Sequence, residues 1–220
     1  MRAEDGQMKI QIGAGEKPYI NITEISYKKI DIFLDDAIGE PSSYRELNYL
    51  LFNAEENDVF PIYINSPGGQ LNTALMIIEG LKNTAGRTIA ILQGECHSAA
   101  SMITMYCDEV MVLDAAHMMI HTAQYGTVGN TGNVKAHTEF TTRQVEGLIH
   151  ETYEGFLSEA EIEKVKLGVE LWFSAEEIRE RMTKRGDWLE KKFTKETQEM
   201  QETPKRKPAA KKRPPSKTTK

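Results

Sequence analysis

The stretch "GECHSAASMI" at residues 94–103 holds two serines, Ser98 and Ser101, among small residues. It follows "RTIAILQG" (87–94), whose apolar and β-branched residues are typical of a strand, and it starts an apparent helix. A hydroxyl at a helix start lies among unpaired N–H groups and the positive end of the helix dipole. Ser98 is therefore either an ordinary N-cap residue or a nucleophile, and the surrounding sequence has to distinguish the two.

Strand-like and helix-like segments alternate on both sides of this stretch. The predicted strands are "KKIDIFLDD", "VFPIYIN", "RTIAILQG", "EVMVL" and "HMMIH". The predicted helices are "SYRELNYLLFNAEEN", "LNTALMIIEGLKN", a short helix from about Ser98 and a long one at about 132–157. This alternation predicts an α/β fold with a largely parallel sheet.

Two loops are expected beyond the carboxyl ends of strands, where sites form in such sheets. One is the segment that contains Ser98. The other is "INSPGGQ" (64–70), in which Gly68 and Gly69 permit positive φ and a close backbone approach. A tight strand-to-helix turn explains the second loop equally well.

A serine nucleophile needs a base within hydrogen-bond reach and an acid that orients this base. The chain has five histidines, and two of them, His117 and His121, share one face of the strand "HMMIH". His121 ends that strand just before a glycine-containing loop. It is best placed to meet a serine at a neighbouring strand end, although a structural histidine there would give the same pattern.

Three motifs in this order resemble the Clp protease proteolytic subunit: "YINSPGG", "GECHSAAS" and "MIH". The phage-type members with a doubled small-Ser pattern are most similar, and the resemblance extends from about residue 30 to about residue 177. It implies the ClpP/crotonase-like α/β fold of repeated β-β-α units, with a protruding handle helix at about 122–157.

The resemblance also assigns catalytic roles. It implies that Ser98 is the nucleophile, that His121 is the general base and that Ser101 packs one helical turn further in. Glu170 in "GVELWFSAEEI" aligns with the third member of the triad, where many relatives have Asp.

The oxyanion hole implied by the resemblance consists of backbone N–H groups of Gly68, Gly69 and Ala99, which need no side chain. Cys96 and His97 depart from the family pattern, in which small apolar residues are usual. We interpret Cys96 as a small buried residue and not as the nucleophile, because it precedes the expected helix start.

Charge is distributed unevenly along the chain. Eight of its 27 Lys and Arg residues lie in 203–220, which leaves 19 against 33 Asp and Glu and a charge of −14 for residues 1–202. We expect an N-terminal arm (1–27), a serine peptidase domain (28–188) and a basic, Pro/Lys-rich disordered tail (189–220). The 203–220 segment could bind an acidic partner or nucleic acid, or could only aid solubility.

The sequence predicts no cofactor and no metal in this chain. It contains no G-x-x-x-x-G-K-[ST] loop, so ATP would be used only by an AAA+ unfoldase partner. No apolar run reaches the ~20 residues of a membrane span. With two cysteines, Cys96 and Cys107, and no signal-peptide core at the start, we expect a cytoplasmic protein, in the host cytoplasm if phage-encoded.

The resemblance implies self-assembly into heptameric rings that stack in pairs and cut delivered polypeptides inside. The apolar stripe of the long helix would then mediate ring stacking, or would face the chain's own core. Three alternatives remain open: a phage head-maturation protease acting on scaffold or capsid proteins, a catalytically silent ring subunit, and a crotonase-type acyl-CoA enzyme.

Overall fold

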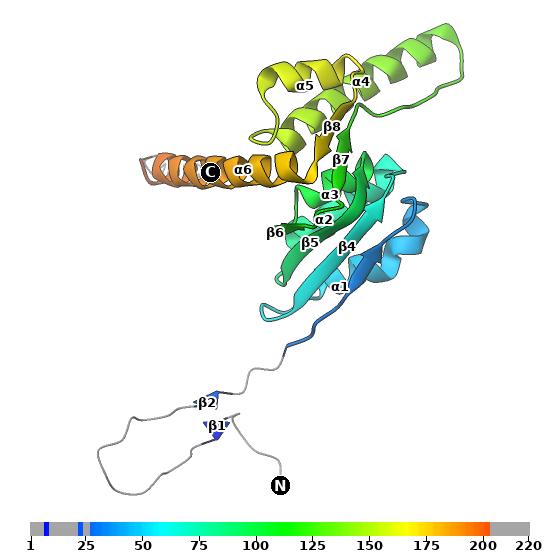
Figure 1. Cartoon of the computed structure of the whole chain (residues 1–220). Helices are drawn as coiled ribbons and strands as arrows, with labels where there is room; N and C mark the ends of the chain where they lie inside the picture. The colour runs from blue at the N-terminus through cyan, green and yellow to red at the C-terminus, as the bar shows by residue number, and fades with distance from the viewer. Residues whose placement is uncertain (1–6, 9–21, 24–26, 203–220) are drawn as a thin grey trace, which may run out of the picture.

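The computed structural model of the chain describes residues 7–8, 22–23 and 27–202, and Figure 1 shows how their elements are arranged. β1 (Gln7–Met8) and β2 (Ile22–Thr23) pair antiparallel. The rest of the expected N-terminal arm before residue 27, and the whole basic segment 203–220, lie outside the described residues. In the described ranges no helix is both long and apolar enough to cross a membrane.

A six-stranded sheet forms the centre of the domain. Its strands are β3 (Ile32–Leu34), β4 (Val59–Ser66), β5 (Arg87–His97), β6 (Glu109–Val112), β7 (His117–Ile120) and β8 (Leu171–Ser174). Their order is β3-β4-β5-β7-β8, and β6 also pairs with β5. Every pair in it is parallel except β7–β8, so the predicted α/β fold with a largely parallel sheet is confirmed.

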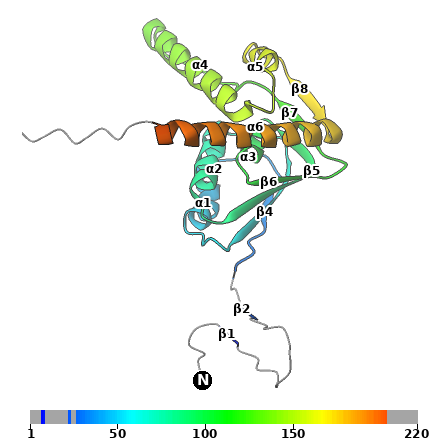
Figure 2. The ribbon, with the colours of Figure 1, turned by 90° about the vertical axis from the view of Figure 1, so that its left-hand side faces the viewer.

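Helices cover one face of this sheet. They are η1 (Pro41–Tyr44), α1 (Arg45–Phe52), α2 (Leu71–Asn83) and α3 (Ala99–Thr104). Figures 1 and 2 both show α1 and α2 against the same side of β4 and β5. Ile64 and Leu92 of the strands and Ile77 of α2 are almost completely buried there, as their apolar spacing predicts.

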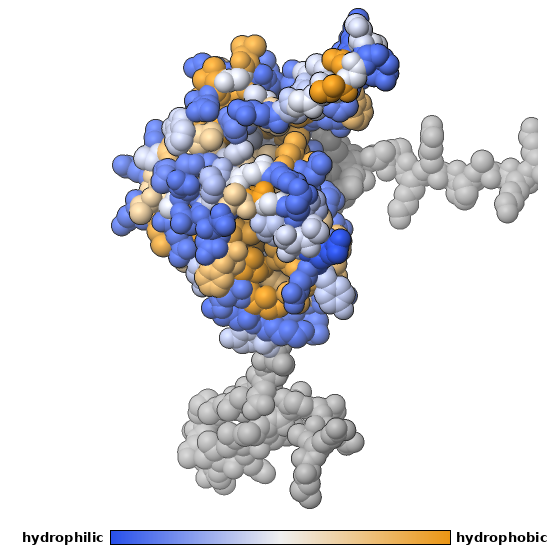
Figure 3. All heavy atoms as spheres, turned by 90° about the vertical axis from the view of Figure 1, so that its right-hand side faces the viewer, coloured by the Kyte–Doolittle hydropathy of each residue, from blue (hydrophilic) through white to orange (hydrophobic). Residues whose placement is uncertain are grey.

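The opposite face carries an exposed apolar row across four neighbouring strands. The register pairs Phe33 with Tyr63, Tyr63 with Ile91, and Ile91 with Met111. The Phe33 and Tyr63 rings are stacked with centroids 4.8 Å apart. Phe33 is 61% exposed and Met111 is 53% exposed. Figure 3 shows apolar surface gathered in the lower part of the body. An exposed apolar row of this kind is a candidate interaction surface.

A helical excursion follows β7. It consists of α4 (Thr131–Tyr153) and α5 (Glu159–Lys166), and Figures 1 and 2 show the start of α4 extending away from the sheet. The Asn130 side chain caps α4 by accepting from the N–H of Asn133 at 3.0 Å. The protruding handle predicted from the sequence is therefore confirmed. It ends slightly earlier than expected because Gly155 turns the chain with φ 81°.

The last helix corrects one expectation. α6 spans Ala175–Glu202, so residues 189–202, which the sequence analysis assigned to the disordered tail, are helical. Their sequence "LEKKFTKETQEMQE" contains mainly strong helix formers and no Pro or Gly. The prolines of the tail begin only at Pro204, after the end of this helix.

Candidate functional site

Ser98 links the end of β5 to the start of α3 in an unusual conformation. Its φ is 52° and its ψ is −120°, and it is the one non-glycine residue with positive φ in the described part of the chain. Its N–H donates to the carbonyl of Met119 at 2.8 Å. Ser98 occupies the N-cap position of α3, but its side chain makes no capping hydrogen bond, so the hydroxyl does not serve as an ordinary N-cap group. Such strain occurs where surrounding contacts hold a functional group in place.

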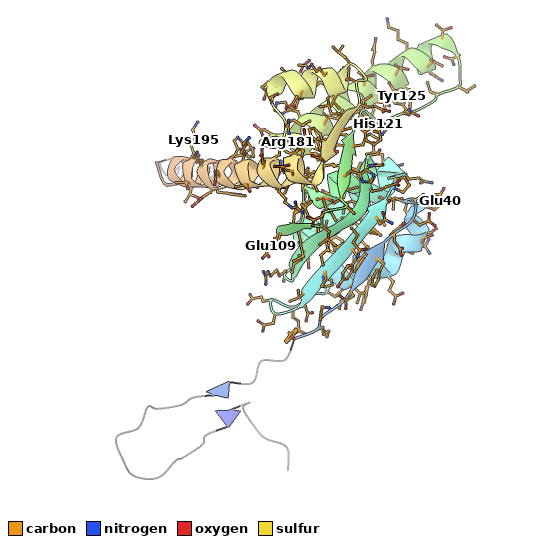
Figure 4. All side chains as sticks on the ribbon, viewed as in Figure 1. Glu40, Glu109, His121, Tyr125, Arg181 and Lys195 are labelled. Carbon is orange, nitrogen blue, oxygen red and sulfur yellow. The ribbon has the colours of Figure 1, made fainter. Side chains whose placement is uncertain are left out.

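His121 is the partner of this serine. Its Nε2 lies 2.7 Å from Ser98 Oγ. The parallel pairing of β5 and β7 places His97 beside Met119, so the two strand ends, with Ser98 and His121, lie next to each other. Figure 4 shows His121 where the sheet meets the helical excursion. With the ring proton on Nδ1, the Ser98 hydroxyl donates to Nε2, which is the arrangement that a general base requires.

Glu170 is near this pair but is not bonded to it. It directly precedes β8, and the last register pair of β7 and β8 joins Ile120 to Leu171. The next position along this register places Glu170 opposite His121. Its side chain is exposed, and the described residues show no hydrogen bond between Glu170 and His121. The structure thus brings Ser98 and His121 into contact, whereas Glu170 lies near them without a hydrogen bond to His121.

The glycine turn after β4 packs directly on the Ser98 segment. A Cβ on Gly68 would lie 2.5 Å from the His97 carbonyl oxygen and 2.7 Å from Ser98 Cβ. A Cβ on Gly69 would lie 2.2 Å from the carbonyl oxygen of Ile38. Both glycines also have positive φ, so a side chain at either position is excluded by contact and by backbone conformation.

The three predicted oxyanion donors are not equivalent. The Gly68 N–H already donates to Ser66 Oγ at 3.1 Å, and this hydroxyl donates in turn to the carbonyl of Asp36 at 2.7 Å. For Gly69 and Ala99, no hydrogen bond of the N–H group occurs within the described part of the chain. These two N–H groups are therefore available for a ligand oxygen.

A cavity of about 480 Å³ opens beside Ser98 and His121. Apolar side chains from several elements line it: Leu71, Met102, Met119, Val145, Leu148 and Ile149. Val145, Ile149 and Tyr153 of α4 are each at most 7% exposed. The buried end of the α4 stripe therefore faces the chain's own core and this cavity, which is the second of the two interpretations given for it. An apolar cavity next to a serine suits an apolar side chain of a ligand.

Two other residues of the opening stretch are buried. Ser101 is fully buried, in agreement with its predicted packing role. Cys96 is also fully buried, and burial raises the pKa of its thiol to about 12, although a hydrogen bond with Thr104 opposes the shift. A thiol so far from ionisation is a poor nucleophile, as the sequence interpretation expected.

Sequence reasoning missed Tyr153 and Ser66. Tyr153 belongs to the apolar stripe of the long helix, yet its hydroxyl lies 2.7 Å from Ser101 Oγ. Ser66 precedes "PGG" and holds the Gly68 N–H. A polar atom on an apolar stripe was the available signal for Tyr153.

In the described ranges, no group of three or more His, Cys, Asp or Glu side chains is arranged to hold a metal ion.

A serine bonded to a histidine, next to unpartnered backbone N–H groups, is the arrangement that serine hydrolases use. The family model described as Clp protease matches residues 14–181, and the chain belongs to the Clp protease family, whose members are serine peptidases. One similar protein is the "ATP-dependent Clp protease proteolytic subunit" of Chlorella vulgaris. It is 24% identical over 135 residues, which cover 60% of this chain and 67% of that protein. The resemblance drawn from the three motifs is thus confirmed.

Proposed function

We propose that this chain is a serine endopeptidase in which Ser98 is the nucleophile and His121 is the general base. The observation that carries the proposal is the 2.7 Å contact between Ser98 Oγ and His121 Nε2, made by a serine with positive φ. Membership of a family of serine peptidases supports the same assignment. Glu170 is proposed as the third member, which would orient His121 and stabilise its charged form.

The proposed reaction has two steps. Ser98 Oγ attacks the carbonyl carbon of a peptide bond while its proton passes to His121 Nε2. The tetrahedral intermediate then expels the amine, which takes that proton and leaves an acyl ester on Ser98. Water gives a proton to His121 and attacks the ester carbonyl; the bond between the acyl carbon and Ser98 Oγ then breaks, the carboxylic acid leaves, and Ser98 Oγ takes the proton back from His121.

The N–H groups of Ala99 and Gly69 are the proposed donors to the oxyanion, because neither has another partner in the described residues. Gly68 could join them only by leaving Ser66 Oγ. In other enzymes the loss of one such donor raises the barrier by about 3 kcal/mol. The apolar cavity next to Ser98 would accept an apolar substrate side chain.

Modification by a fluorophosphonate tests this proposal. The labelled peptide should map by mass spectrometry to Ser98, and the label should disappear in Ser98→Ala and His121→Ala. His137→Ala, which removes an exposed histidine of α4, is the matched control and should label normally. Label on Ser101 would overturn the assignment of the nucleophile. A folded oligomer without label would favour a catalytically silent subunit.

We further propose that the chain assembles into rings supplied with substrate by a separate ATP-dependent unfoldase. The name of the algal relative describes an ATP-dependent protease, and the family supports an oligomer. The exposed row of Phe33, Tyr63, Ile91 and Met111 is apolar surface that an assembly would bury.

Native mass spectrometry tests the assembly. Phe33→Ser should reduce the population of the largest oligomer. Phe193→Ser is the matched control, because Phe193 on α6 is 63% exposed, nearly the same fraction as Phe33. A Phe33→Ser protein with the same oligomer populations as the wild type would show that the row takes no part in assembly.

A further inference from the structure

The backbone of Ser98 is held by a chain of two buried hydroxyl groups. Ser101 Oγ lies 2.7 Å from the carbonyl oxygen of Ser98. The hydroxyl of Tyr153 lies 2.7 Å from the same Ser101 Oγ. Ser101 belongs to α3, one turn after Ser98, whereas Tyr153 is the last residue of α4. The hydroxyl chain therefore joins the strained residue to a tyrosine more than fifty positions later in the sequence.

The direction of both hydrogen bonds is determined by chemistry. A carbonyl oxygen can only accept, so the single proton of Ser101 must point to the carbonyl of Ser98. Ser101 Oγ is then an acceptor for its other neighbour, and Tyr153 must donate. Burial raises the pKa of Tyr153, so its hydroxyl keeps the proton that this bond requires. The order is Tyr153 to Ser101 to the Ser98 carbonyl.

Both side chains are buried, and the helices that carry them are linked by a further contact. Ser101 is fully buried and Tyr153 is 1% exposed. Arg185 of α6, which is 6% exposed, donates to the carbonyl of Met105 just after α3 and to that of Glu154 just after α4. One guanidinium thus links the ends of the two helices that carry the hydroxyl chain. Tyr153 also lines the cavity beside Ser98.

We propose that Tyr153 is a positioning residue for the nucleophile and that it acts through Ser101. The hydroxyl chain holds the carbonyl of Ser98, and with it the left-handed conformation that aims Oγ at His121 and leaves the Ala99 N–H free. Without the tyrosine hydroxyl, Ser98 could relax toward an ordinary helix start, because a positive φ is unfavourable for serine. The proposal rests on the proposed function of Ser98.

Tyr153→Phe tests it, because this change removes the hydroxyl and keeps the ring against the cavity. The probe is the fluorophosphonate, with the maximal labelling rate (kinact) separated from its binding constant (KI). We expect kinact to fall about tenfold, the equivalent of one ordinary hydrogen bond, with KI unchanged. Tyr106→Phe is the matched control. It removes a hydroxyl bond of 3.3 Å to Thr152, between the same two segments but without contact to Ser98, and should leave kinact unchanged.

The double variant Ser101→Ala/Tyr153→Phe separates positioning from stability. Ser101→Ala alone leaves the tyrosine hydroxyl buried without a partner, so it should lower the urea midpoint. Replacing both groups by apolar ones should restore most of that stability. All proteins are labelled under conditions in which they are fully folded. If Tyr153 positions Ser98, kinact should remain low in the double variant even though its urea midpoint recovers.

Two results would overturn the proposal: an unchanged kinact in Tyr153→Phe, or a kinact that recovers in the double variant together with the urea midpoint. A wild type that takes no label at Ser98 would refute the proposed function and the positioning role with it. Normal labelling of the wild type combined with either of the first two results would refute only the role of Tyr153.

Discussion

Leu171 pairs with Ile120 at the end of the antiparallel β7–β8 ladder, and this pair places Glu170 next to His121. Residues directly opposite in such a ladder carry their side chains on the same face, with Cβ atoms about 5 Å apart. Continued by one position, the same register would bring Glu170 and His121 opposite each other, which supports the proposal that Glu170 is the third member of the triad.

We predict that Glu170→Gln lowers kcat about a hundredfold while the fold is retained, because His121 would lose the charge that orients and stabilises its imidazolium form. Glu170→Asp should retain more activity than Glu170→Gln. Glu176→Gln, which changes an exposed glutamate at the start of α6, should have no effect. The measurement is kcat for a fluorescent peptide substrate. Equal kcat values for wild type and Glu170→Gln would exclude Glu170 from the triad.

A second prediction concerns the turn that packs on Ser98. Gly68→Ala should destabilise the protein by about 2 kcal/mol or more, because the new methyl group would overlap the His97 carbonyl and because φ is positive there. Gly186→Ala in α6 meets no atom within 4 Å and should stabilise by up to about 1 kcal/mol. Urea unfolding of the two variants checks both signs. A Gly68→Ala protein as stable as wild type would show that the turn can move away from Ser98.

The sequence was sufficient for the parts of the site that follow from strand order. Strand order predicts that Ser98 and His121 lie close together, because each comes at or beyond the end of a strand and parallel strands bring these ends to one edge, while their catalytic roles came from the family resemblance. The glycine turn was predictable for the same reason. These features depend on local patterns and on one rule of topology.

The parts that could not be predicted depend on contacts between distant segments. The Tyr153–Ser101 bond requires the end of α4 to return to α3, and no local pattern specifies that distance. The hydrogen bond that occupies the Gly68 N–H depends on the rotamer of Ser66. Residues 189–202 continue α6 because they contain strong helix formers and no Pro or Gly, whereas the composition that indicates disorder is confined to residues 203–220.

A third prediction follows from the burial of Cys96. Burial raises the pKa of the Cys96 thiol to about 12, so its thiolate fraction near pH 8 should be far lower than that of an exposed cysteine. Iodoacetamide should therefore leave Cys96 unmodified in the native protein and alkylate it in urea. Mass spectrometry of tryptic peptides reads out both conditions. Rapid native alkylation that also abolishes fluorophosphonate labelling would restore Cys96 as a candidate nucleophile.

The fourth prediction concerns the ion pair that joins α5 to α6. Arg181 donates to both oxygens of Glu161, at 2.8 Å and 3.1 Å, and the N–H of Ser158 donates to the same carboxylate at 2.9 Å. The labelled Arg181 in Figure 4 lies on α6. These contacts lower the pKa of Glu161 from 4.5 to about 2, and the hydrogen bonds from Arg181 make the largest contribution.

A carboxyl group whose pKa is lower in the folded state stabilises the fold above its unfolded pKa. The contribution of Glu161 should be complete above about pH 4.5 and should disappear as the pH falls toward about 2. Glu161→Gln should therefore be less stable than wild type by about 1 kcal/mol at pH 7, a modest value because both side chains are about a quarter exposed. The difference should shrink when urea unfolding is repeated at pH 3. Glu163→Gln, in the same helix with a 63% exposed carboxylate, should give a smaller difference at pH 7. A Glu161→Gln difference that stays constant between pH 7 and pH 3 would show that the helix cap, and not the charge, is the source of the stability.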